Sequence, residues 1–93
     1  MRILHLTLKR KWFDMVASGE KREEYREVKP YWRKRLVGKH YDAVKFRNGY
    51  RKDSPWVLVG LDCIYRSLGL IKWGAPPAVT VYILALGKIL DRG

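Results

Sequence analysis

Residues 56–67, with the sequence WVLVGLDCIYRS, predict a long β-strand. Apolar and β-branched residues dominate this stretch, and alternate positions of a strand share one face. Gly60 allows a bend in its middle. Cys63 falls on the apolar face, so we expect a buried thiol with a structural role. That face carries Val57, Val59, Leu61, Cys63 and Tyr65.

Four further strands and two short helices are predicted around this stretch. Trp12, Met15 and Val16 recur at helical spacing, and Gly19 follows them as a C-terminal stop. Pro30 suits the first position of a second helix. The predicted strands are 3–8, 20–28, 42–47 and 79–86, the predicted helices are 9–18 and 31–37, and residues 68–78 are mostly loop.

Together these elements predict a single domain, residues 1–93, of the α+β class: mainly β, with two short helices. Five alternating strands in a chain of 93 residues favour a small curved sheet or β-barrel. Hydrophobic residues make up 47% of the chain, which is enough for one core and argues against a disordered chain.

The single cysteine excludes an intrachain disulfide and favours a reducing compartment. No apolar run approaches the roughly 20 residues of a membrane helix. The first residues lack the apolar stretch of a signal peptide. We therefore expect a soluble cytoplasmic protein without a membrane partner.

The formal net charge of +11 is concentrated in the first half of the chain. Residues 1–52 hold sixteen basic and six acidic residues, whereas residues 53–93 hold four and three. Aromatic residues are interleaved with the basic ones. Because basic groups release counterions from phosphates and rings stack on unpaired bases, this favours a nucleic-acid partner. The alternative is a solvated surface with the aromatics in the core. An anionic membrane is a weaker candidate, since no long basic amphipathic helix is visible.

Several common sites are excluded by spacing. The two Gly-Lys pairs lack the spacing and the following hydroxyl of a phosphate-binding P-loop. No Gly-x-Ser-x-Gly nucleophile motif occurs. A tetrahedral metal site needs at least three convergent ligands, and the His and Cys residues are scattered. We therefore expect no metal and no cofactor. The scattered residues are His5, His40 and Cys63.

Residues 19–26, Gly-Glu-Lys-Arg-Glu-Glu-Tyr-Arg, fit the pattern Gly-x-Lys-x-x-Glu-x-Arg. In this octet the sequence resembles the ASCH domains, a branch of the PUA-like superfamily. Residues 12–18 look like the first helix of that family. Residues 45–49 and 73–76 are similar to segments of its small stand-alone members. The resemblance covers most of the chain.

The resemblance implies a PUA-like β-barrel with a cleft lined by the octet, in a protein that binds RNA or nucleotides. Some related proteins are hydrolases: one branch removes an acyl group from modified cytidine, and other members have been proposed as ribonucleases. The amidohydrolase branch has Thr where this chain has Glu24, which separates this chain from it. The alternative function is a hydrolase of modified nucleosides or a ribonuclease, with Lys21 and Glu24 as catalytic residues.

Strand geometry brings two side chains of the octet together. Glu24 and Arg26 are two residues apart and share a strand face, where a guanidinium orients the carboxylate and keeps it ionised. Strict alternation puts Lys21 on the other face. Its amine reaches Glu24 only if the backbone bulges or is not extended at residues 22–23, which the preceding Gly19 favours. We expect Lys21, Glu24 and Arg26 to converge.

Two roles compete for this cluster. As binding residues, Lys21 and Arg26 contact phosphate, and Glu24 accepts a hydrogen bond from an exocyclic amine or a sugar hydroxyl. As a catalyst, Lys21 acts as base or nucleophile. No second catalytic acid is evident, which favours binding. An ion-pair ladder on a solvated strand is the structural alternative.

Further ligand contacts are expected around the cleft. Lys9 and Arg47 track an RNA backbone, Tyr50 stacks on a base, and Trp73 either forms a wall of the pocket or simply packs. Trp32 is a second stacking candidate or a core residue. The remaining basic rim consists of Arg10, Lys11, Arg33, Lys34, Arg35, Lys45, Arg51 and Lys52.

Overall fold

Five β-strands and two α-helices alternate along the chain in the computed structural model, which describes residues 1–93. The predicted class, mainly β with two short helices, is confirmed. One short 3-10 helix, η1 (Ile71–Trp73), lies within the predicted loop. The other elements are β1 (Ile3–Thr7), α1 (Arg10–Ala17), β2 (Glu23–Glu27), α2 (Pro30–Leu36), β3 (Ala43–Arg47), β4 (Trp56–Leu68) and β5 (Thr80–Arg92).

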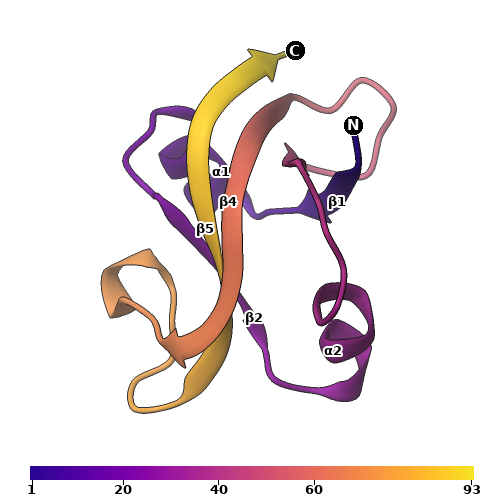
Figure 1. Cartoon of the computed structure of the whole chain (residues 1–93). Coiled ribbons are helices and arrows are strands. Elements are labelled where there is room, and N and C mark those ends of the chain that lie inside the picture. The colour runs from indigo at the N-terminus through magenta and orange to yellow at the C-terminus, as the bar shows by residue number, and fades with distance from the viewer.

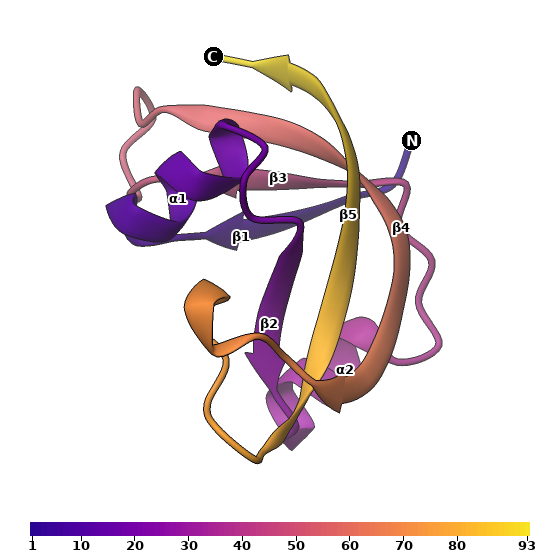
Figure 2. The same cartoon turned by 90° about the vertical axis from the view of Figure 1, so that its left-hand side faces the viewer.

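The five strands form one mixed sheet in the order β1-β3-β4-β5-β2. β1 and β3 are parallel, and every other neighbouring pair is antiparallel. The sheet curls into a half-barrel, with β4 and β5 running side by side as a long curved pair (Figure 1). β1 and β2 stand at the two edges of the sheet (Figure 2). The expected curved sheet is therefore observed, and it stays open between β1 and β2.

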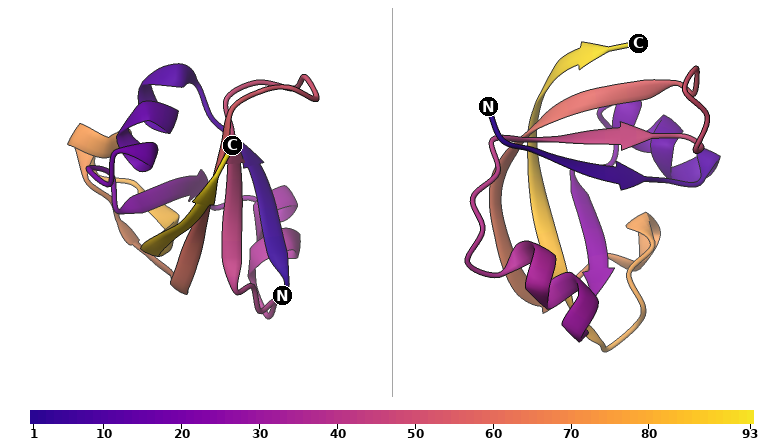
Figure 3. Two further views of the ribbon diagram at one scale, coloured as in Figure 1. Left: turned by 90° about the horizontal axis from the view of Figure 1, so that it is seen from above. Right: turned by 90° about the vertical axis from the view of Figure 1, so that its right-hand side faces the viewer.

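One hydrophobic core fills the half-barrel. The two helices lie toward opposite ends of it (Figure 3), yet Phe13 and Val16 of α1 and Leu36 of α2 all enter the same core. Phe46 at its centre is completely buried. Burial of one such side chain contributes about 1.5–3 kcal/mol. The strands contribute Leu4, Leu6, Val44, Phe46, Val57, Val59, Tyr82, Leu84 and Leu86.

β5 continues to Arg92, beyond the predicted end at residue 86. Gly87 and Lys88 resemble a strand end in the sequence, but β4 supplies partners beyond them: Val57 of β4 pairs with Arg92. Gly87 lies close to β4 here, since a Cβ on it would lie 2.7 Å from Asp62 Oδ1 and would displace that side chain. Pairing with a distant strand, rather than local composition, sets the length of β5.

Cys63 is exposed, which corrects the prediction of a buried thiol. The apolar face of β4 is buried at Val57 but exposed at Cys63 and Tyr65. β3 pairs with β4 only as far as Gly60, and the register between β4 and β5 shifts at three points from residue 58 to residue 63. These register shifts change which alternate residues face inward, so that Ile64, paired with Leu84, packs against the core. Cys63 therefore falls on the outer face of the sheet.

Candidate functional site

The turn after α1 sets the position of Lys21. Gly19 follows the helix with a φ of +84°, a conformation that a residue with a Cβ rarely adopts. The Lys21 N–H then donates to the carbonyl of Met15 at 2.9 Å, and β2 begins only at Glu23. Lys21 is therefore still bonded back to α1, whereas the next residue, Arg22, already bonds to β5 by accepting from the Leu86 N–H at 2.9 Å. Regular strand alternation thus does not extend back to Lys21, and its side chain reaches the face of Glu24.

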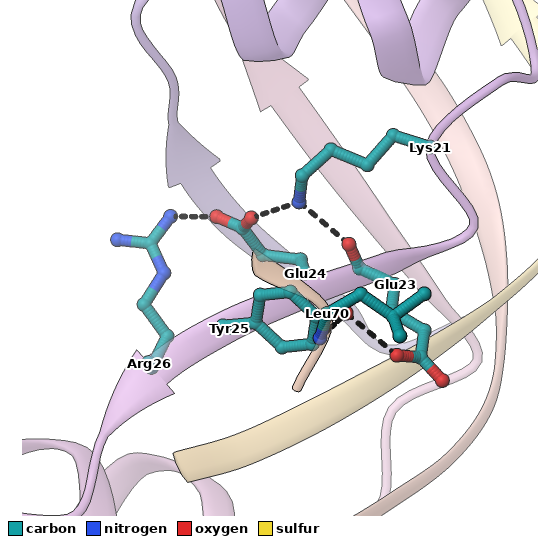
Figure 4. Close-up of polar contacts among 6 residues, drawn as sticks. All are labelled: Lys21, Glu23, Glu24, Tyr25, Arg26 and Leu70. Carbon is teal, nitrogen blue, oxygen red and sulfur yellow. Dashed lines mark hydrogen bonds and ion pairs between the residues drawn. The ribbon is translucent and has the colours of Figure 1, made fainter. Parts of the chain in front are cut away.

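Lys21, Glu24 and Arg26 converge, as the sequence predicts (Figure 4). Lys21 Nζ lies 2.6 Å from Glu24 Oε1 and also donates to the carbonyl of Glu23. Arg26 Nη2 lies 2.6 Å from Glu24 Oε2. Lys21 is only 2% exposed and Glu24 only 6%. Each carboxylate oxygen thus has its own cation, which offsets the cost of removing these charges from water.

This charged cluster lies on the core side of the sheet. Glu24 and Arg26 pair with Leu84 and Tyr82 of β5, two members of the core. Cross-strand partners share a face, so both charged side chains lie on the inner face. An ion-pair ladder on a solvated strand is therefore excluded for Lys21 and Glu24, because both are buried.

Aromatic rings flank both cations. Lys21 Nζ lies 5.9 Å from the ring centroid of Trp12 and 5.2 Å from that of Tyr25. Arg26 Cζ lies 4.8 Å from the ring centroid of Trp32. These distances allow cation–π attraction. Trp32 therefore lies against the Arg26 guanidinium.

Arg26 retains one unused hydrogen-bond donor. Its Nε is buried and has no hydrogen-bond partner, and no other buried side-chain nitrogen or oxygen lacks one. Buried polar groups are nearly always bonded, so an unpaired donor of this kind calls for an acceptor. The Arg26 side chain is 19% exposed, against 1% for Lys21 and 8% for Glu24, so it has the most solvent contact of the three. An anionic oxygen is the strongest acceptor for a guanidinium.

Lys21 is poorly placed for catalysis. A base or nucleophile must reach its substrate, whereas the Lys21 side chain is 1% exposed and its amine donates to the Glu24 carboxylate and the Glu23 carbonyl. Glu24 in turn has both oxygens bound. The arrangement is suited to holding Arg26 and to binding an anion.

A second network on the other face of β2 holds the segment around η1. Tyr25 Oη donates to Glu23 Oε1 at 2.7 Å and accepts from the Leu70 N–H at 3.0 Å (Figure 4). Tyr65 Oη donates to Glu23 Oε2 at 3.2 Å. Burial, reinforced by the Glu23 carboxylate, raises the pKa of Tyr25 to about 12. Strand alternation indicates the face of Tyr25 but not its partner 45 residues away, so local sequence patterns do not predict this network.

Three of the other predicted ligand residues gather elsewhere, at the C-terminal ends of β1 and β3. Lys9 follows β1, Arg47 ends β3, and Tyr50, 93% exposed, lies in the next turn. Arg47 points to the opposite face of β3 from the core residue Phe46. We call Lys9, Arg47 and Tyr50 the outer basic patch. None of them hydrogen-bonds or ion-pairs with the cluster, so the structure does not bring the predicted residues into one cleft.

Trp73, unlike the outer basic patch, belongs to a segment that lies near the Trp12 ring beside Lys21. It is half-buried in η1, with Lys72 Nζ 5.1 Å from its ring centroid. The next residue, Gly74, faces the indole of Trp12, and a Cβ on it would lie 3.0 Å from that ring. The Trp73 segment therefore adjoins the aromatic ring beside Lys21.

A hollow of about 140 Å³ borders Lys21, lined also by Gly19, Arg22 and Leu86. Pockets that enclose a small ligand usually measure about 300–1,000 Å³. A nucleotide therefore does not fit inside this hollow, and the exposed side of Arg26 is the accessible part of the cluster.

Most of the positive charge has no acidic partner. The chain has 20 Lys and Arg residues and 9 Asp and Glu residues. Only four of these cations lie within 4.0 Å of a carboxylate oxygen: Arg10, Lys21, Arg26 and Lys29. The surface therefore carries a large uncompensated positive charge.

No three His, Cys, Asp or Glu side chains come together as a metal-binding group. Neither helix combines the length and the apolar character that a membrane crossing requires. Comparison of the chain with protein-family models, curated proteins and solved structures found no match. Its function is therefore inferred from its own residues.

Proposed function

We propose that this protein binds RNA or a nucleotide through its positively charged surface. The observation that carries the proposal is the surplus of cations, because only four of the 20 Lys and Arg side chains contact a carboxylate. A phosphate backbone is the partner that such a surface attracts, since each neutralised phosphate releases counterions. The resemblance of residues 19–26 to the ASCH octet supports the same function.

In this proposal Lys21 and Glu24 position Arg26, and Arg26 contacts the ligand. Glu24 Oε2 fixes one terminal nitrogen of the guanidinium, and the Trp32 ring lies within cation–π distance of it. The Nε–H that has no partner in the protein donates to a phosphate oxygen of the ligand. Trp73, in the adjoining segment, lies at the border of this contact.

The outer basic patch provides the second contact. Lys9 and Arg47 carry unpaired charges that follow a sugar–phosphate backbone, and the exposed ring of Tyr50 offers a face on which a base stacks. Because this patch and Arg26 lie on opposite faces of the sheet, a single-stranded RNA that reaches both passes around an edge of the half-barrel.

Fluorescence anisotropy with labelled single-stranded RNA tests the proposal. We expect binding at about 50 mM salt that weakens steeply by about 200 mM salt, as phosphate-dominated binding does. Mononucleotides in a thermal-shift assay distinguish a nucleotide ligand from RNA, since a binder raises the melting temperature by linkage. Absence of binding to both at about 50 mM salt contradicts the proposal.

Hydrolysis of a modified nucleoside or of RNA is the alternative, and the same samples test it. The protein is incubated with an acylated cytidine and with labelled RNA, and product is followed by chromatography. Because the Lys21 side chain is buried beneath its contacts with Glu23 and Glu24, we expect no turnover. Product that disappears in a Lys21→Ala variant of native fold establishes the hydrolase instead.

A further inference from the structure

β4 has a free edge along its second half. β3 pairs with β4 from Trp56 to Gly60, and the Leu61 N–H still donates to the carbonyl of Asp42 at 3.0 Å. Beyond Leu61, β5 is the only strand beside β4. Backbone groups of a strand point alternately to its two edges, so the groups of residues 62–66 that point away from β5 have no strand partner.

A groove of about 380 Å³ runs along this free edge. All of residues 61–66 line it, although alternate side chains of a strand point to opposite faces. The groove therefore lies beside the edge of β4, with the backbone as one wall. Residues 36–41, the end of α2 and its connection to β3, form the other wall (Figure 2). None of the cluster residues Lys21, Glu24 and Arg26 lines this groove.

The groove has an apolar lining and a cationic rim. Eight of its 13 lining residues are hydrophobic, among them Leu36 and Tyr82. Lys39 and Arg66 on the rim are exposed, and neither contacts a carboxylate. The one carboxylate in the lining, Asp62, lies against Gly87 of β5 and therefore leans away from the free edge.

We propose that this groove binds an extended acidic segment of a partner protein, which adds a strand to the free edge of β4. The segment's backbone bonds to the unpaired groups of residues 62–66, its apolar side chains enter the groove, and its carboxylates meet Lys39 and Arg66. This interaction is independent of RNA binding.

The shape of the groove favours this occupant over two others. Residues 61–66 extend for roughly 20 Å at about 3.3 Å per residue, a length that suits a peptide of about six residues and exceeds a single nucleotide. A second copy of this chain has a net charge of +11 and is repelled by the cationic rim. Residues 36–41 of that copy also lie beside its own β4 edge, where they obstruct pairing of the two edges. Charge and shape therefore both favour a single acidic strand.

Amide hydrogen exchange by NMR, with a blocked hexapeptide that alternates valine and glutamate as probe, tests the proposal. We expect saturating peptide to slow exchange of the edge-facing amides of residues 62–66 by roughly tenfold or more, because they become hydrogen-bonded. A hexapeptide with lysine in place of glutamate, and one with a methylated backbone, are expected to leave these amides unchanged.

Two charge reversals sharpen the test. Arg66→Glu and Lys39→Glu are each expected to weaken peptide binding about fivefold or more, since each replaces an attraction by a repulsion. Lys52→Glu makes the same change of charge in the exposed turn before β4, outside the groove, and is expected to leave peptide binding unaffected. Urea unfolding of each variant verifies that the fold is retained.

Three results overturn the proposal. The first is unchanged exchange at residues 62–66 in saturating acidic peptide. The second is protection of these amides by a mononucleotide and not by the peptide, which makes the groove a nucleotide site. The third is protection that grows with protein concentration alone, which makes the β4 edge an interface between copies.

Discussion

At the start of β2 the cations point into the protein, whereas at the ends of β1 and β3 they point into solvent. Lys21 is buried and shares the carboxylate of Glu24 with Arg26. Lys9 and Arg47 have no acidic partner at all. A buried ion loses several kcal/mol of hydration and needs a partner, while an exposed ion keeps its water. Lys21 and Glu24 therefore maintain the structure, and the outer cations, like the partly exposed Arg26, remain available to a ligand.

Removal of the shared carboxylate is expected to have the largest effect on stability. Glu24→Ala leaves the buried Lys21 ammonium without a counter-charge, so we expect a loss of about 3–5 kcal/mol in the free energy of unfolding, measured with urea. Glu27→Ala is the matched control, because Glu27 lies on the same strand, is 77% exposed and holds Lys29 at 3.8 Å. We expect less than about 1 kcal/mol from it. Similar losses from both variants would show that the inner charges are not structural.

Tyr25→Phe tests how much the network of Tyr25, Glu23 and Leu70, on the other face of β2, stabilises the protein. It removes the bonds to Glu23 and to the Leu70 N–H, so we expect a loss of about 1–2 kcal/mol at neutral pH. The folded-state pKa of about 12 lies above the ordinary value of 10.0. The stabilisation from protonated Tyr25 is therefore complete below pH 10.0 and is lost as the pH rises through about 12.

The measurement for Tyr25 is the free energy of unfolding of the native and Tyr25→Phe proteins at neutral pH and near pH 12. The difference between the two proteins is expected to shrink at the higher pH. A difference that stays constant across this range contradicts the assignment of the raised pKa to the bonded state of Tyr25.

Arg47→Ala is expected to have the smallest effect, and only on binding. Loss of one phosphate contact lowers the slope of log affinity against log salt by about 0.7 for single-stranded RNA. Stability is expected to stay within about 0.5 kcal/mol, because Arg47 makes no ion pair. An unchanged slope would place the RNA path away from the outer basic patch.

Local sequence patterns predicted the elements because each pattern acts within a few residues. Helical spacing at Trp12, Met15 and Val16, followed by Gly19, indicated α1 and its end. The same turn led to the correct prediction that Lys21 and Glu24 meet, since Lys21 is bonded back to α1 and lies before the regular strand. These inferences needed no knowledge of distant partners.

Predictions that depended on distant partners were wrong or incomplete. Cys63 belongs to an apolar face in the sequence, but the register shift between Leu61 and Cys63 puts it on the outer face, where it is exposed. The length of β5 depends on β4, and the bond from Leu70 to Tyr25 joins residues 45 positions apart. Alternation specifies which way a side chain points, and only the neighbouring elements decide whether it is buried.

β2 stands at the edge of the sheet, and its only strand neighbour is β5. During synthesis, β2 therefore leaves the ribosome well before the strand that holds it exists. Glu24 and Arg26 remain hydrated in the nascent chain until residues 80–92 emerge, and only then do the charges move into the core. Assembly of the cluster is thus coupled to completion of the sheet, as expected for a fold that pairs strands distant in sequence.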